Sequence, residues 1–262
     1  MATSNAHRLA LQSFLSRGVM SSSEVKELHK FSCETFGVRH ERTEECLRDF
    51  LEAINTNINS LGMEIRSKKD EETGKLMFAL VRTTESELGR LASDYHKNDL
   101  ELFKKILDLI VESDTGMASS TDVLNLTSHI KEKISKQEAQ SILRRLIKEK
   151  WLTESQGEIS LAPRAIMELE HYLIDVYEED IRHCHLCKEI VVKGQICSCG
   201  LKLHNFCAAR LFRGKNDCKC PKCQESWDYE ILTDDRDAPS TSSAATTSKD
   251  TRPTGRKRKD RH

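Results

Sequence analysis

The sequence predicts a mainly α-helical protein with small β elements, built as two similar units, a short metal-binding segment and a disordered tail. Three observations predict this class. An order of three helices and a hairpin occurs twice, eight of the ten cysteines lie between Cys184 and Cys223, and apolar residues almost disappear after residue 232. We therefore expect domains at 1–97, 98–180 and 181–232, with a disordered basic tail at 233–262.

The composition limits the possible partners. Of 262 residues, 32% are charged and 37% hydrophobic, and the formal net charge is -1. Such a chain has no global attraction to nucleic acid or to an acidic membrane, so any attraction has to be local. No stretch approaches the roughly 18 apolar residues of a membrane span, and the first residues do not resemble a secretion signal. We expect an intracellular protein without a membrane partner.

The helices of the first unit are predicted from capping and periodicity. A capping box of Ser21 and Glu24 opens a helix that closes at Gly37. The helix before it ends at Gly18, and its apolar stripe is Leu9, Leu11, Phe14 and Leu15. A third helix within 41–62 repeats apolar residues at threes and fours, namely Cys46, Leu47, Phe50, Leu51, Ile54, Ile58 and Leu61.

A β-hairpin completes this unit and the order then recurs. Residues 63–83 have two β-capable ends around a polar turn that contains Gly74. Three more helices are predicted at 98–113, 119–133 and 135–152, and a small wing with its turn at 155–157 follows them. Pro163 suits the first turn of a last helix. Three helices followed by a hairpin is the order of a winged-helix domain, so the sequence predicts two of them in tandem.

The third helix of the second unit is a candidate nucleic-acid contact. In helix-turn-helix proteins this element enters the major groove. The alternative is a solvated charged face, the more frequent use of such residues, and winged helices also dock proteins. The candidate contacts are Lys136, Arg144, Arg145 and Lys148.

The cysteines indicate bound metal, because thiols in a reducing compartment rarely form disulfides. Cys33 and Cys46 stand alone in helices and are expected to be small buried hydrophobes. Two-residue spacings join Cys184 to Cys187, His204 to Cys207 and Cys220 to Cys223, and Cys197 with Cys199 forms a tighter pair. Four pairs suffice for two closed tetrahedral zinc sites, which leaves Cys218 over. An iron-sulfur cluster is a weaker alternative.

The order of four cysteines, one histidine and three cysteines, ending in C-P-K-C, resembles the RING family. Its cross-brace implies one zinc site of Cys184, Cys187, His204 and Cys207, and a second of Cys197, Cys199, Cys220 and Cys223. The spare Cys218 could replace Cys220. The PHD finger shares this ligand order, but it would usually have an aromatic residue at position 218.

RING modules bind a ubiquitin-conjugating enzyme in a shallow apolar groove. The resemblance places Leu186 and Pro221 in that groove, with Trp227 as an aromatic neighbour. Such a ligase forms no covalent intermediate, so no catalytic residue is expected, and it acts by positioning. Gln224 departs from the pattern, because many active RING ligases have a basic residue there.

Over roughly residues 7 to 232 the chain resembles the non-SMC element one family of the chromosome-maintenance complex built on the fifth and sixth SMC proteins. The segments that carry the resemblance include CHLCKEIVVKGQICSCGLKLHNFC and KWLTESQGEISLAPRAIMELE. The family implies a nuclear, chromatin-associated ubiquitin ligase subunit acting in DNA repair and homologous recombination.

The family also implies partners. These are a MAGE-type subunit that enhances ligase activity, a kleisin-like subunit, the SMC heterodimer and a ubiquitin-conjugating enzyme. DNA is a further candidate partner, through the basic helix at 135–150. The alternative function is a non-catalytic, zinc-stabilised assembly or DNA-contacting subunit. The basic run GRKRKDRH at the end of the chain fits a nuclear address, and the alternatives are a weak phosphate contact and a solubilising tail.

Overall fold

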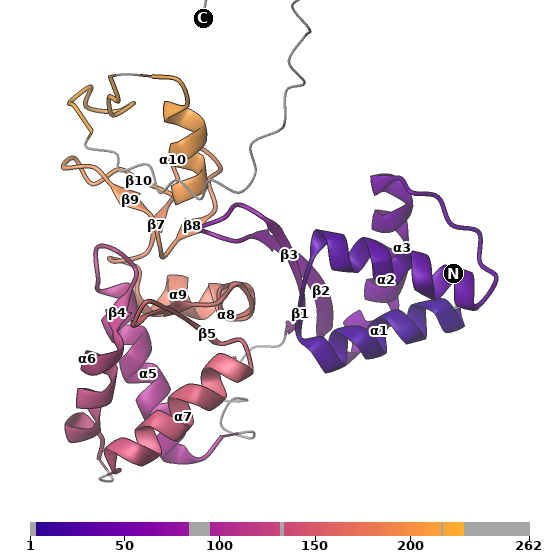
Figure 1. Ribbon diagram of the computed structural model, residues 1–262, viewed down its shortest axis with the longest axis horizontal. Coiled ribbons are helices and arrows are strands. Elements are labelled where there is room, and N and C mark those ends of the chain that lie inside the picture. The colour runs from indigo at the N-terminus through magenta and orange to yellow at the C-terminus, as the bar shows by residue number, and fades with distance from the viewer. Residues whose placement is uncertain (1–3, 84–94, 132–133, 216, 228–262) are drawn as a thin grey trace, which may run out of the picture. The chain divides into compact units, whose positions relative to one another are not determined.

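The computed structural model describes residues 4–83, 95–131, 134–215 and 217–227, all of which belong to one compact unit, Met1–Tyr229 (Figure 1). It is helix-rich with small antiparallel sheets, as the sequence predicts. The expected domain boundaries stay predictions, and the tail at 233–262 lies outside the described residues. Among these residues, no helix is long and apolar enough to span a membrane.

The first group of elements consists of three helices and a three-stranded sheet. In chain order these are α1 (Asn5–Arg17), β1 (Val19–Ser21), α2 (Ser22–Thr35), α3 (Glu44–Ile58), η1 (Asn59–Leu61), β2 (Met63–Lys69) and β3 (Leu76–Arg82). The strand order is β1-β3-β2, with Met20 opposite Phe78 and Ile65 opposite Leu80. The hairpin is where the sequence predicts it, and β1 is an additional edge strand.

Local signals explain where these helices begin, but periodicity overestimates the buried face. The Ser21 backbone N–H donates to Glu24 Oε2 at 2.7 Å, which confirms the expected capping box. Leu15 and Leu61 were expected on the apolar stripes, and this is wrong, because they are 62% and 68% exposed. Leu15 lies outside the buried face of α1, and Leu61 lies beyond the end of α3.

The second group repeats this order. Its elements are α5 (Lys97–Val111), β4 (Ala118–Ser119), α6 (Ser120–Asn125), η2 (Leu126–His129), α7 (Lys136–Lys148), β5 (Leu152–Ser155), β6 (Glu158–Leu161), α8 (Pro163–Glu168) and α9 (Glu170–Val176). The strand order is β4-β6-β5. Pro163 occupies the first turn of α8 as expected, but the single last helix is divided into α8 and α9 at Leu169.

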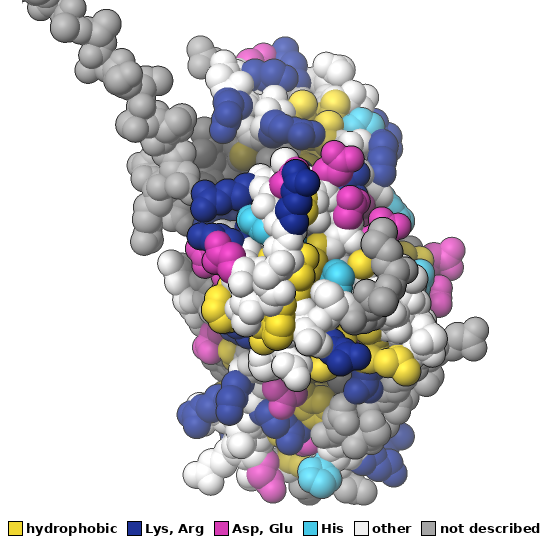
Figure 2. Space-filling view, turned by 90° about the vertical axis from the view of Figure 1, so that its right-hand side faces the viewer, with side chains coloured by type: hydrophobic (Ala, Val, Ile, Leu, Met, Phe, Trp, Pro, Cys, Tyr) yellow, Lys and Arg dark blue, Asp and Glu magenta, His cyan; other side chains and the backbone are white. Residues whose placement is uncertain are grey.

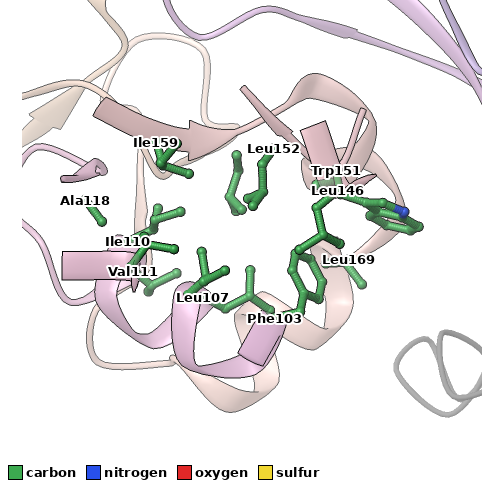
Figure 3. Packing of buried hydrophobic residues seen from close by; sticks show 14 of the residues in the cluster. Phe103, Leu107, Ile110, Val111, Ala118, Leu146, Trp151, Leu152, Ile159 and Leu169 are labelled. Carbon is green, nitrogen blue, oxygen red and sulfur yellow. The ribbon is translucent and has the colours of Figure 1, made fainter. Parts of the chain in front are cut away.

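The largest core lies within this second group (Figure 3). Side chains of α5 point inward toward those of α7 and of the strands β5 and β6. Phe103, Leu146 and Ile159 are almost completely buried, and Trp151 packs edge-to-face on Phe103 at a ring distance of 6.0 Å. This core holds the β5–β6 hairpin against α5 and α7.

The cysteine-rich segment forms two short hairpins and a helix. These are β7 (Arg182–His183) paired with β8 (Ile190–Val191), β9 (Gln195–Ile196) paired with β10 (Lys202–Leu203), and α10 (Asn205–Phe212). Because side chains alternate along a strand, Ile190 and Val192 join the core of the second group, while Val191 joins the core of the cysteine-rich segment. Residues 190–192 therefore contribute to both cores and connect the cysteine-rich segment to the second group.

A glycine permits this junction. Gly116 has φ +70°, and a Cβ atom there would lie 2.2 Å from the carbonyl oxygen of Val192. Only glycine fits both the left-handed backbone and the close approach.

The described surface carries mixed charge. On the face that Figure 2 presents, basic and acidic side chains are interspersed. This mixture on the visible face agrees with the formal net charge of -1.

Truncating the core tests this architecture. Leu146 is 1% exposed, so Leu146→Ala is expected to lower the free energy of unfolding by about 2–5 kcal/mol through lost burial and a residual cavity. Denaturant unfolding with zinc present measures the change. The control, Leu61→Ala, removes a side chain that is 68% exposed and should stay within about 0.5 kcal/mol of wild type. Equal effects of the two changes would contradict the packing.

Candidate metal centre

The first cluster is formed by Cys184, Cys187, His204 and Cys207, whose ligand atoms all lie within 4.8 Å of one another. Cys184 and Cys187 lie on the turn between β7 and β8. His204 is the N-cap residue of α10 and Cys207 lies in its first turn, so both side chains leave the helix on one side. The segment thus brings its first and third pairs together.

The second cluster is formed by Cys197, Cys199, Cys220 and Cys223. Cys197 Sγ lies 3.6 Å from Cys223 Sγ, and Cys199 Sγ lies 3.7 Å from Cys220 Sγ. Two sulfurs bound tetrahedrally at about 2.3 Å from one zinc stand about 3.8 Å apart. The thiol spacing therefore fits zinc, and sulfur donors favour zinc over magnesium or calcium.

Two of the cysteine turns have the same backbone hydrogen bonds. Cys184 N–H donates to Glu189 O at 2.8 Å and Lys188 N–H to Cys184 O at 2.9 Å. In the other turn, Cys220 N–H donates to Glu225 O and Gln224 N–H to Cys220 O, both at 3.0 Å. Lys188 and Gln224 occupy equivalent positions, with φ of 67° and 62°.

The turn that carries the tighter pair is one residue shorter. Cys197 N–H donates to Leu201 O, and Gly200 N–H donates to Cys197 O, both at 2.8 Å. Gly200 has φ +80° and closes the turn. A left-handed glycine thus allows two thiols separated by one residue to reach the same cluster.

Cys218 belongs to neither cluster in the described structure. Its Sγ lies 4.0 Å from Lys215 O, and its carbonyl oxygen accepts from Trp227 N–H at 2.7 Å. The geometry thus favours Cys220 over Cys218 as the thiol of the second cluster.

Backbone N–H groups lower the pKa of one thiol in each cluster, which favours the thiolate form that binds metal. Burial opposes ionisation of Cys184, but N–H groups of Cys187, His204 and Leu186 outweigh it and lower the pKa of its thiol to about 6. The N–H of Cys199 lowers the pKa of Cys197 to about 6. Burial raises the pKa of Cys207 to about 12. Metal binding therefore has to release protons from the remaining thiols.

The tautomer of His204 is set by its neighbours. Its Nε2 lies 2.9 Å from the carbonyl oxygen of Ile190, to which the N–H form donates, while Nδ1 lies 3.3 Å from Cys187 Sγ. Nδ1 thus faces the cluster and is free to bind a metal ion. Glu71, which the sequence analysis did not single out, lies 3.5 Å from Nε2.

The three residues expected to bind a conjugating enzyme differ in exposure. Leu186 is half-buried and Pro221 is exposed, each on its cysteine turn. Trp227 is 6% exposed and packs edge-to-face on Phe212. It is thus part of the core of the cysteine-rich segment.

The candidate nucleic-acid contacts on α7 also differ. Lys136, Arg144 and Lys148 are exposed. Arg145 pairs with Asp99 and lies over the ring of Tyr95 at 4.6 Å. Its guanidinium is therefore used within the fold.

Comparisons with known proteins find two family models. One, described as Nse1 non-SMC component of SMC5-6 complex, matches residues 7–169, and one for a RING-like domain matches residues 184–223. Two curated relatives are named non-structural maintenance of chromosomes element 1 homolog. That of Xenopus laevis is 39% identical over 86% of this chain and 84% of its own length. The human protein is 36% identical over 87% and 85%.

A solved structure titled Nse1-Nse3-Nse4 complex matches with a TM-score of 0.82. It is 37% identical and covers 88% of this chain and 100% of its own chain. The RING-like match and the two clusters agree with two zinc ions in this segment.

Zinc stoichiometry tests the two clusters. We expect two zinc ions on the wild type and one on His204→Ala or Cys220→Ser, because each change removes one of four ligands from a single cluster. Native mass spectrometry counts the ions. Cys218→Ser is the matched control and should keep both. Loss of an ion from Cys218→Ser, or two ions retained on His204→Ala, would contradict the grouping.

The pH dependence of zinc affinity tests the two thiols of low pKa. Protons compete with the metal for thiolates, so affinity should fall as the pH falls. Below about pH 6, Cys197 must also lose a proton on binding, so the slope for the second site should steepen by about one proton. At the first site both Cys184 and His204 add to the slope, because burial, which lowers the pKa of His204, is outweighed by Glu71, which raises that pKa above its usual value. Competition with a chelator of known protonation between about pH 5 and 8 measures it. A constant slope through pH 6 would be the contrary result.

Proposed function

Because the chain belongs to the family of Nse1 non-SMC components of the SMC5-6 complex, we propose that it is the RING-type ubiquitin ligase subunit of that complex. The observation that carries the proposal is the interleaving of two Cys/His clusters along one RING-like segment. Interleaved pairs are what a cross-brace requires, and a chain of separate zinc fingers would group neighbouring pairs instead.

The zinc ions supply shape rather than chemistry. In the proposal, the first cluster holds one ion and the second holds the other, and every protein ligand position is filled. A zinc ion with four protein ligands has no open position for water, which is typical of structural sites. The ligase then acts by holding the conjugating enzyme and its thioester-linked ubiquitin in a geometry that favours attack by a substrate lysine.

The proposed conjugating-enzyme site lies on the two cysteine turns with the same backbone hydrogen bonds. Leu186 and Pro221 are available there for contact. Trp227 supports this surface from within the segment, since it is buried against Phe212.

The similar solved complex supports two of the proposed partners. Its title names Nse3 and Nse4, which correspond to the MAGE-type and kleisin-like subunits. We assign each of the two described groups as a winged-helix unit, because each has helices followed by a paired hairpin. We further propose that these two units form the region that contacts the MAGE-type subunit. We also propose that the protein acts on chromatin in the nucleus, together with the SMC heterodimer. Its role there is in DNA repair and homologous recombination.

A non-catalytic assembly or DNA-contacting role is the second candidate. It is supported by Gln224, a neutral residue where many active RING ligases have a basic one. If α7 contacts DNA, only Lys136, Arg144 and Lys148 are available to phosphate groups, because Arg145 pairs with Asp99.

Ubiquitin discharge from a panel of conjugating enzymes tests the ligase proposal, with the chain assembled with its MAGE-type and kleisin-like subunits. We expect the complex to accelerate discharge and Leu186→Ala to reduce it about tenfold, the equivalent of about 1.4 kcal/mol of lost contact. Zinc content should not change.

Ile196→Ala is the matched control, because Ile196 is 41% exposed on β9 of the same segment and lies on neither of these turns. It should retain wild-type discharge. No acceleration by the wild-type complex with any enzyme of the panel would reject the ligase role and leave the assembly role. Full activity of Leu186→Ala would reject the assigned surface.

A further inference from the structure

The turn of the β2–β3 hairpin lies beside the cysteine-rich segment (Figure 1). This turn carries a carboxylate that is hydrogen-bonded to the segment. Glu71 is 4% exposed. Its Oε1 accepts from Val192 N–H at 2.8 Å and its Oε2 from Lys193 N–H at 2.9 Å. Both carboxylate oxygens are thus held by backbone donors that lie more than a hundred residues further along the chain.

The same carboxylate approaches the first metal cluster from behind. Glu71 Oε1 lies 3.5 Å from His204 Nε2, the ring nitrogen that faces away from the thiols. Histidines that bind zinc usually donate their other N–H to a carboxylate or a carbonyl, which orients the ring and strengthens the metal bond. Here the carbonyl of Ile190 takes the direct hydrogen bond at 2.9 Å, and Glu71 adds negative charge beside it.

Other contacts fit the turn to this place. The ring of Phe206 stacks on His204 at 5.1 Å, with 12° between the ring planes, and Lys69 Nζ lies 5.6 Å from the centre of the Phe206 ring. Gly74 has φ +68°, and a Cβ atom there would lie 2.8 Å from Phe206 Cβ. The hairpin turn therefore contacts both the zinc-facing histidine and the ring that packs against it.

Ion pairs lie on both sides of this contact, and the one with an exposed partner adds little to it because solvent screens the charges. Lys193 pairs with Glu72 of the turn. Lys68, which is 9% exposed, pairs with Glu170 at 2.8 Å and with Glu189 at 3.4 Å. The second cluster, as described, consists of four cysteines and contains no residue of the hairpin.

We propose that Glu71 is a positioning residue for the first zinc site, and that the N-terminal hairpin thereby controls how firmly that site, but not the second, retains its ion. The carboxylate orients His204 and, through Val192 and Lys193, fixes the backbone that follows β8. This role does not depend on ubiquitin ligase activity, and its readout is the metal itself.

The test uses the full chain with Glu71→Gln, which keeps the shape and one carbonyl oxygen but removes the charge. With zinc loaded, we expect a chelator to remove one of the two ions at least about tenfold faster than from wild type. With cadmium-113 in place of zinc, the resonance of the site with one nitrogen and three sulfur ligands should shift, and that of the four-sulfur site should not. Glu71→Asp should fall between Glu71→Gln and wild type.

Glu72→Gln is the matched control, because Glu72 is exposed and pairs with Lys193 without approaching His204. It should behave as wild type. Gly74→Ala is a second variant that displaces the turn with the carboxylate intact, and it should weaken the same site. Unchanged release and resonances in both Glu71→Gln and Gly74→Ala would overturn the proposal. So would equal loss from both sites, which would make Glu71 a residue of general stability.

Discussion

The cysteine-rich segment depends on one constraint, which is that it has too little apolar material to fold without metal. Its buried cluster contains Cys184, Cys197, Cys207 and Cys220 among only ten residues, so a large share of this core consists of thiols. Thiols gathered within 4.8 Å of one another would repel once ionised unless a cation is shared between them. Two zinc ions therefore act as the cross-links of the segment, and the turns that display Leu186 and Pro221 are held by them.

The spacing of the cysteines follows from the backbone of each turn. Where two residues separate the thiols, a five-residue hydrogen-bonded turn forms and its fifth position is left-handed. Where one residue separates them, the turn is shorter and the left-handed position falls on Gly200. Lys188 occupies in the first turn the position that Gln224 occupies in the last. Because the equivalent position in the first turn is a lysine, the backbone of the turn does not require a neutral residue at 224. The neutral side chain of Gln224 therefore affects what this surface can bind and is not needed for the fold.

Much of the fold could be predicted from the sequence because its signals are local. The Ser21 capping box, the hairpin turn at Gly157 and the four cysteine pairs each depend on residues a few positions apart. The strands β1 and β4 could not be predicted, because two or three residues carry no alternation and exist only as edge partners of a hairpin. Arg145 and Glu71 were also out of reach, since each is charged and looks like a surface residue until a partner 46 or 121 positions away is known.

The contact between the hairpin and the later segments includes buried charged groups, and these have a physical consequence. Ala79 and Val81 pack on Met167 and the turn at Gly74 lies against Phe206, while Lys68 and Glu71 are buried charged groups of the same contact. An apolar contact tolerates a small shift, whereas a displaced hairpin would leave buried charges without partners, which is strongly unfavourable. The hairpin therefore docks in one register or not at all. The position of the hairpin that gives the Glu71 carboxylate its backbone hydrogen bonds also brings it next to Nε2 of His204. Correct docking of the hairpin and correct orientation of this zinc ligand therefore occur together.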